Sequence, residues 1–105
     1  MITKPAPLES SIVKAILKYL NSLPECYAVK TYGDAKRAGT PDIDGCLKGR
    51  SLKLEVKRPE PYGTPLTKLQ AETLERWRKA GAITGVVRSV QDVKELLQKE
   101  GVIEK

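Results

Sequence analysis

Residues 39–59 read GTPDIDGCLKGRSLKLEVKRP, and this stretch decides the fold. Apolar and polar side chains alternate through residues 51–57, which is the pattern of a β-strand with one buried face. Residues 42–47 form a second candidate strand, and the short segment 48–50 between the two strands has the composition of a turn. The stretch therefore predicts an antiparallel β-hairpin.

This hairpin brings two carboxylates together. If the Lys48-Gly49 pair is the turn, counting outwards along both strands places Asp42 directly opposite Glu55. Directly opposed residues point to the same face of a sheet, with Cβ atoms about 4.5–5.5 Å apart. Two carboxylates at that distance repel each other unless a cation lies between them, and a divalent ion would satisfy both. Lys57 shares this face, where its ammonium could contact a bound water or a phosphate.

Two further acids could join this pair. Asp44 lies on the same face but deeper toward the turn, so it ranks below Asp42 as a ligand. Glu9 precedes Val13 by four residues and Ile16 by seven, so it borders the apolar side of a predicted helix and could lean over the sheet. The alternative interpretations are a first-turn acid favoured by the helix dipole and alternating surface charge along a solvated strand. Spacing alone leaves these interpretations open.

The flanking segments complete an α/β pattern. Helical spacing of apolar residues and runs of β-branched residues predict three helices and two more strands. In chain order, these are a helix over residues 8–23, a strand over 26–32, a helix over 67–80, a strand over 82–88 and a helix over 89–100. The order α-β-β-β-α-β-α indicates a mixed four-stranded sheet flanked by helices, in a single domain that spans residues 1–105.

The second predicted helix begins with a recognisable signal. Thr67 and Gln70 have the spacing of a capping box, in which two side chains and two backbone amides satisfy each other. Leu69, Leu74 and Trp77 follow at helical spacing and are predicted to face the core, with stacking on a base as the less favoured alternative for Trp77. The capping box accounts for Gln70 by itself, so the sequence leaves open whether this side chain also serves a site.

The composition narrows the possible chemistry. There are 19 Lys and Arg residues against 13 Asp and Glu, and a small domain with a net charge of +6 often binds nucleic acid. The absence of histidine excludes Ser/His/Asp triads, Cys/His dyads and zinc sites with His ligands. Hydrolysis would therefore depend on carboxylates, lysine and a hard metal ion. Two cysteines and no apolar leader predict a cytoplasmic protein in a reducing environment, with no membrane association.

The ordered motifs resemble those of the PD-(D/E)xK nuclease superfamily. Pro41-Asp42 matches the PD element and Glu55-Val56-Lys57 the ExK element, within that superfamily's restriction-endonuclease-like αβββαβ order. More narrowly, the chain is similar to stand-alone members of the virus-type replication-repair nuclease family, VRR-Nuc. Over residues 8–88, the places of that family's motifs are filled by Glu9, Gly39-Thr40-Pro41-Asp42, Glu55-Val56-Lys57 and Gln70.

This resemblance implies a DNA endonuclease that depends on Mg²⁺ or Mn²⁺. The ligands that it implies are Asp42, Glu55, the main-chain carbonyl of Val56 and, as a further ligand, Glu9. Lys57 would orient the attacking water and stabilise charge in the transition state. Gln70 would hold the lysine or the water, unless the capping box is its whole role.

Basic residues around the motifs form the predicted DNA-binding surface. The candidates are Lys30, Lys36, Arg37, Arg58 and, for stacking on a base, Tyr62. Viral-type stand-alone relatives imply a branched substrate such as a four-way junction, a role in DNA repair, and a viral or phage protein acting inside its host. A junction needs two symmetric cuts, so we expect a C2 homodimer. A catalytically inactive DNA-binding module of the same fold is the alternative.

Overall fold

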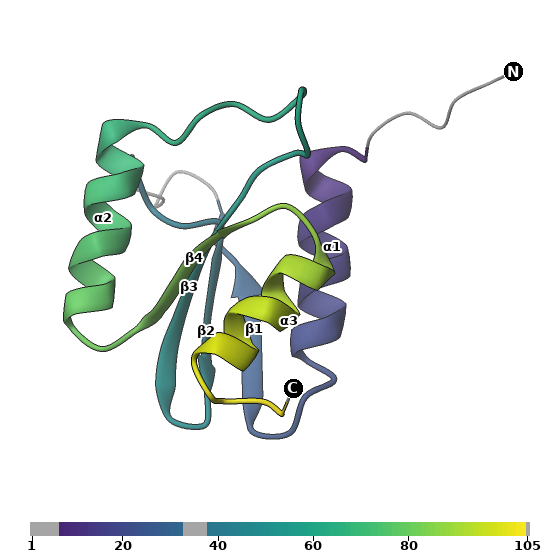
Figure 1. The fold of residues 1–105 in the computed structure, drawn as a ribbon, viewed down its shortest axis with the longest axis vertical. Helices are drawn as coiled ribbons and strands as arrows, with labels where there is room; N and C mark the ends of the chain where they lie inside the picture. The colour runs from purple at the N-terminus through teal and green to yellow at the C-terminus, as the bar shows by residue number, and fades with distance from the viewer. Residues whose placement is uncertain (1–6, 33–37, 105) are drawn as a thin grey trace, which may run out of the picture.

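The structure is a computed structural model, and it describes residues 7–32 and 38–104. Its elements follow the predicted order (Figure 1), with bounds that differ from the expected ones by at most three residues. They are α1 (Glu9–Leu20), β1 (Cys26–Lys30), β2 (Ile43–Leu47), β3 (Arg50–Val56), α2 (Lys68–Lys79), β4 (Ile83–Val87) and α3 (Val90–Lys99). No helix within these two ranges is long and apolar enough to cross a membrane.

The β2–β3 hairpin has the predicted register. Leu47 pairs with Arg50, and the antiparallel ladder continues residue by residue to the start of β2. Lys48 and Gly49 form the turn, with φ angles of 51° and 83°. Both angles lie in the left-handed region, as a two-residue turn that matches the strand twist requires. Glycine adopts this conformation freely, so Gly49 fixes the register although Lys48 is a poor residue for such a turn.

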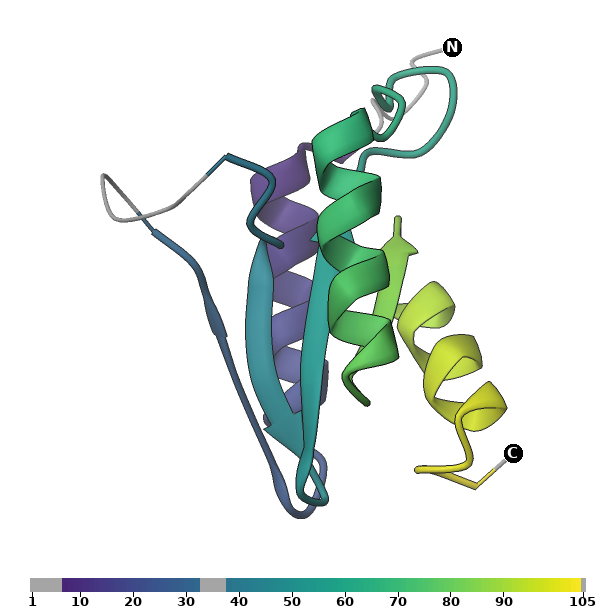
Figure 2. The same cartoon turned by 90° about the vertical axis from the view of Figure 1, so that its left-hand side faces the viewer.

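The sheet is mixed and has helices on both faces. Its strand order is β1-β2-β3-β4, with antiparallel pairing from β1 to β3 and parallel pairing of β3 with β4. The parallel pair needs a crossover, which α2 provides. Figure 2 shows α1 behind the sheet and α2 in front of it. This confirms the predicted α/β architecture, a mixed four-stranded sheet flanked by helices.

The hydrophobic core lies between the sheet and the α1–α3 pair. Ile16 and Leu20 of α1, Leu54 of β3, and Val93 and Leu97 of α3 are fully buried there. The apolar stripe predicted for α1 and the inward face predicted for α3 are thereby confirmed. Burying one such side chain stabilises the fold by roughly 1.5–3 kcal/mol, so this layer supplies most of the hydrophobic stabilisation.

On the other face, α2 packs differently from the prediction. Only Leu74 is buried in this helix, whereas Leu69 is 47% exposed and Trp77 is 38% exposed. The prediction that Leu69 and Trp77 belong to the core is therefore wrong. The physical reason is that α2 covers the polar face of β3, which offers little apolar surface to pack against. The capping box is confirmed: Gln70 N donates to Thr67 Oγ1 at 3.1 Å, and Thr67 N donates to Gln70 Oε1 at 2.9 Å.

Candidate active site

Four charged side chains are buried on the face of the sheet that α2 covers: Lys53 and three of the predicted site residues. Asp42 is 8% exposed, Glu55 is 3% exposed and Lys57 is 7% exposed. Alternating charge on a solvated strand would leave these groups in water, so that interpretation is wrong for this strand. Removing charges from water is costly unless they are paired and hydrogen-bonded. Such a cluster therefore needs specific partners, which β3, α2 and the loop before α2 supply.

Asp42 is fixed from two sides. Its Oδ2 accepts a 2.8 Å hydrogen bond from the backbone N–H of Val56. Thr31, directly after β1, donates from its N–H to Asp42 O at 2.9 Å and from its hydroxyl to Pro41 O at 2.8 Å. At this end, the last pair of the β2–β3 ladder is Ile43 with Leu54. Extending the register by one more step places Asp42 opposite Glu55. Both side chains therefore point to the same face, as the hairpin count predicts.

Gln70 links the glutamate to the lysine. Its Nε2 lies 3.4 Å from Glu55 Oε1, and its Oε1 accepts a 3.3 Å hydrogen bond from Lys57 Nζ. Lys57 Nζ also donates to Thr64 Oγ1 at 3.4 Å. The same Gln70 oxygen accepts from Thr67 N in the capping box. The two roles that the sequence left open for Gln70 are thus combined in one side chain.

The donor set suits a hard divalent cation. Asp42 and Glu55 supply carboxylate oxygens, and Glu55 Oε2 is itself buried. In an extended strand the N–H and C=O of one residue point to the same side, so the Val56 carbonyl points toward the side of Asp42. Carboxylate and carbonyl oxygens are the ligands that Mg²⁺ and Mn²⁺ prefer. Mg²⁺ usually keeps several waters, so two carboxylates and a carbonyl would be sufficient protein ligands.

The structure does not bring a third acid into this pair. No group of three Asp, Glu, His or Cys side chains within residues 7–32 and 38–104 is placed to hold a metal. Glu9 is exposed in the first turn of α1. It lies at the same end of the sheet as the pair, because Arg58 Nε donates to Pro7 O at 3.1 Å just before α1 (Figure 1). Its role as a ligand stays a prediction.

Asp44 has a different partner. Its Oδ1 lies 2.5 Å from Lys53 Nζ, and the Lys53 side chain is only 10% exposed. On its other side, the Lys53 ammonium lies 4.0 Å from the centre of the Trp77 ring. The hairpin count does place Asp44 opposite Lys53, so this ion pair had a sequence signal. The contact with Trp77 had none, because it joins elements that are distant in the chain.

The predicted DNA-binding residues fall into two groups. Arg58 and Tyr62 follow β3 and lie together, with the guanidinium 5.0 Å from the ring centre and the tyrosine 56% exposed. Lys30, at the end of β1, lies 5.4 Å from the Tyr32 ring. Lys36 and Arg37 lie outside the described residues.

Comparisons with known proteins bear on the fold and the family of this chain. No family model matches the sequence, and no curated protein matches it. Among solved structures, one described as a VRR_NUC domain is 30% identical, with 86% of this chain and 94% of that chain covered and a TM-score of 0.69. A second, described as a VRR_NUC domain protein, is 15% identical, with coverage of 91% and 89% and a TM-score of 0.70. The second supports the fold alone.

Proposed function

This chain belongs to the VRR-Nuc domain family, and on that premise we propose that it is a Mg²⁺- or Mn²⁺-dependent endonuclease that hydrolyses phosphodiester bonds in DNA. The observation that carries the proposal is the burial of Asp42, Glu55 and Lys57 around Gln70. A protein that only bound DNA would gain nothing from two buried carboxylates, since they repel phosphate.

In this proposal, Asp42, Glu55 and the Val56 carbonyl hold the ion, with Glu9 as a further ligand. A divalent ion there would generate a nucleophile from water at neutral pH and offset negative charge on the phosphate. The hydrogen bond from Val56 N keeps Asp42 Oδ2 in place, so the carboxylate is oriented before the ion binds. Gln70 restrains Glu55 in the same way, because its Nε2 donates to Glu55 Oε1.

Lys57 is the proposed catalytic cation. An ammonium has three N–H donors, and Gln70 and Thr64 accept two of them. The third can donate to a phosphate oxygen, whose negative charge grows as the water attacks. A fixed donor in a buried site stabilises that charge more strongly than a mobile lysine in water would. Gln70 and Thr64 therefore act as positioning residues for Lys57.

The proposed substrate is branched DNA, with a four-way (Holliday) junction as the favoured form. The net charge of +6 favours binding to phosphates, and Lys30, Lys36, Arg37 and Arg58 are the proposed contacts, with Tyr62 as a stacking residue. No base-reading motif is present in the sequence, which favours recognition of DNA shape. Two symmetric cuts in a junction need two active sites, so we propose that the chain acts as a C2 homodimer.

A cleavage assay tests the function. The protein is incubated with linear, flapped and four-way DNA in Mg²⁺, in Mn²⁺ and in EDTA. We expect cutting of the branched substrates with either ion and none in EDTA. Lys57→Ala should be inactive, and Lys94→Ala, a matched lysine on α3 across the sheet, should retain activity. Tight binding without cutting by the parent protein would instead support the inactive DNA-binding module.

A further inference from the structure

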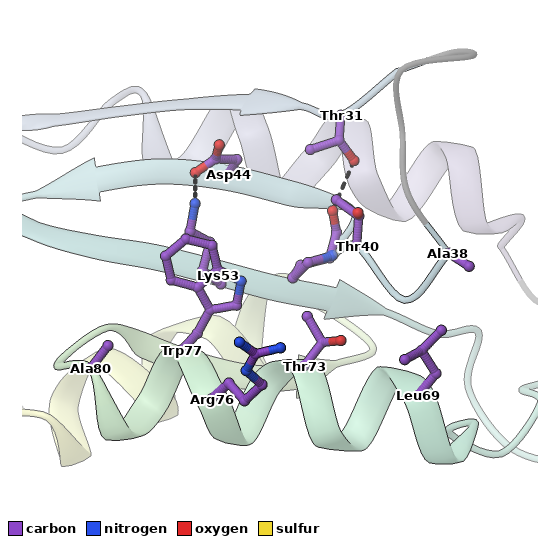
Figure 3. A pocket seen from close by; sticks show the side chains of 11 residues that line it. Thr31, Ala38, Thr40, Asp44, Lys53, Leu69, Thr73, Arg76, Trp77 and Ala80 are labelled. Carbon is purple, nitrogen blue, oxygen red and sulfur yellow. Dashed lines mark hydrogen bonds and ion pairs between the residues drawn. The ribbon is translucent and has the colours of Figure 1, made fainter.

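A cleft opens between α2 and the polar face of β2 and β3 (Figure 3). Its volume is about 590 Å³, which is in the range of small-molecule binding sites. Pro41, next to Asp42, lines it at one side, and Leu69, next to Gln70, lines it at the other. The cleft therefore lies beside the candidate active site, although its walls are formed by different residues.

Trp77 forms an aromatic wall of this cleft. Trp77 is 38% exposed, although α2 lies on a sheet that could have covered its side chain. The ring is held from one side by the Lys53 ammonium, 4.0 Å from its centre, and Asp44 holds that ammonium in turn. The indole is thus fixed in orientation before any ligand arrives, which lowers the entropy lost on binding.

The other walls supply hydrogen-bonding groups and positive charge. Thr40 from the β2 side and Thr73 from α2 both line the cleft with hydroxyl groups, and Arg76 lines it from the same helix. Figure 3 shows Thr73 and Arg76 pointing from α2 toward the strands. Arg78, which does not line the cleft, is instead paired with Glu75 at 2.6 Å, and the hydrogen bond from Arg78 lowers the pKa of Glu75. Lys53 and Asp44 also line the cleft, but they are paired with each other, so Arg76 adds a positive charge beyond that pair.

We propose that this cleft receives the base of an unpaired nucleotide adjacent to the scissile phosphate, with the base stacked on Trp77. This inference rests on the proposed function and makes its substrate more specific. An aromatic wall, hydroxyl groups and a cation match a base with its phosphate, and stacking on an indole is tolerant of base identity. A base inside a duplex cannot enter without leaving the stack, so the cleft selects DNA with unpaired nucleotides.

Trp77 is the single tryptophan of the chain, so its fluorescence reports on the cleft directly. In EDTA, where nothing is cut, the protein is titrated with a thymidylate octamer and with an abasic octamer of the same backbone and charge. We expect the thymidylate octamer to quench the fluorescence and the abasic octamer to leave it largely unchanged. Equal quenching by both, or no quenching by either, would overturn the proposal.

Variants of the cleft separate the contribution of the bases to the affinity from that of the DNA backbone. With labelled octamers and fluorescence anisotropy, the parent should bind thymidylate roughly tenfold more tightly than the abasic octamer. Trp77→Phe keeps a ring and should retain most of this preference. Trp77→Leu should lose it, with affinity for the abasic octamer unchanged. Thr73→Leu, which fills the cleft and leaves Trp77 in place, should also lose this preference. If the Thr73→Leu variant still prefers the thymidylate octamer, the cleft is not the site that binds the base.

These results are independent of the proposed nuclease activity. If the parent cuts junctions in Mn²⁺ but shows no preference for the octamer with bases, the nuclease proposal stands and the base cleft is rejected. If the parent cuts nothing yet shows the base-dependent quenching, the cleft stands and the nuclease proposal is rejected.

Discussion

Lys57 donates a 3.3 Å hydrogen bond to the side-chain oxygen of Gln70, thirteen residues later in the chain. Gln70 is also the third residue of α2 and closes its capping box. The position of the proposed catalytic ammonium therefore depends on the residue at which α2 begins. Any change that moves the start of α2 should move the lysine and the contact of Gln70 with Glu55.

The two roles of Gln70 can be separated by substitution. Gln70→Glu keeps an oxygen for Thr67 N and Lys57 but replaces the N–H that faces Glu55 with a negative charge. Gln70→Ala removes both roles. We expect Gln70→Ala to lose about 1 kcal/mol of stability, because the cap is incomplete, and Gln70→Glu to lose less. Both should cut junctions roughly 10–100-fold more slowly.

The measurements for Gln70 are the melting temperature and the single-turnover cutting rate. If Gln70→Glu recovers the cutting rate together with the stability, Gln70 acts only as a helix cap.

Lys57→Ala should abolish cutting while DNA and metal binding remain largely intact. The reason is that Lys57 lies beside the two carboxylates, on the same face and two residues after Glu55, and is not itself a ligand. The checks are the cutting rate in Mn²⁺, the affinity for junction DNA in EDTA, and the shift in melting temperature on adding Mn²⁺. Normal turnover by a folded Lys57→Ala protein would remove lysine from the mechanism.

Asp42 and Glu55 should share one divalent ion. Asp42→Asn keeps an oxygen that can accept the hydrogen bond from Val56 N, so it removes the charge with little change in shape. We expect the metal-free variants Asp42→Asn and Glu55→Gln to be as stable as the parent or slightly more stable, because one of two repelling charges is gone. Both should lose most of the thermal stabilisation by Mn²⁺.

The measurement for this pair is the melting temperature with and without Mn²⁺. If Mn²⁺ stabilises Asp42→Asn as strongly as the parent, Asp42 is not a ligand. Asp44 would then be the candidate, and it would first have to release Lys53.

The Asp44–Lys53 pair should respond asymmetrically to substitution. The Lys53 side chain is 10% exposed and that of Asp44 is 47% exposed. Asp44→Asn leaves a buried ammonium with a weaker partner and should cost about 1–3 kcal/mol. Lys53→Met leaves a carboxylate that water can reach and keeps an apolar contact with Trp77, so it should cost less than about 1 kcal/mol. Denaturant unfolding of both single variants and of the double variant measures these losses in the free energy of unfolding. Equal losses for the two single variants would contradict the burial of Lys53.

The sequence by itself determined the features that depend on residues close together in the chain. Gly49 tolerates the left-handed turn, and the turn sets the hairpin register by simple counting. The capping box at Thr67 and Gln70 starts α2 where the spacing predicts. The apolar stripes of α1 and α3 identified the core layer, since helical spacing puts those side chains on one face. These are local effects, and the period of the pattern is enough to predict them.

The tertiary structure alone decided which face of the sheet is covered and by what. Alternation along β3 separates two faces, but it does not reveal that α2 lies over the charged one and buries Lys53, Glu55 and Lys57. The same packing left Trp77 exposed at a cleft, although its spacing was that of a core residue. The energy of a buried charge depends on partners from distant segments, as the reach of Gln70 to both Glu55 and Lys57 shows. Periodicity carries no information about such partners, so these contacts are decided only in the folded chain.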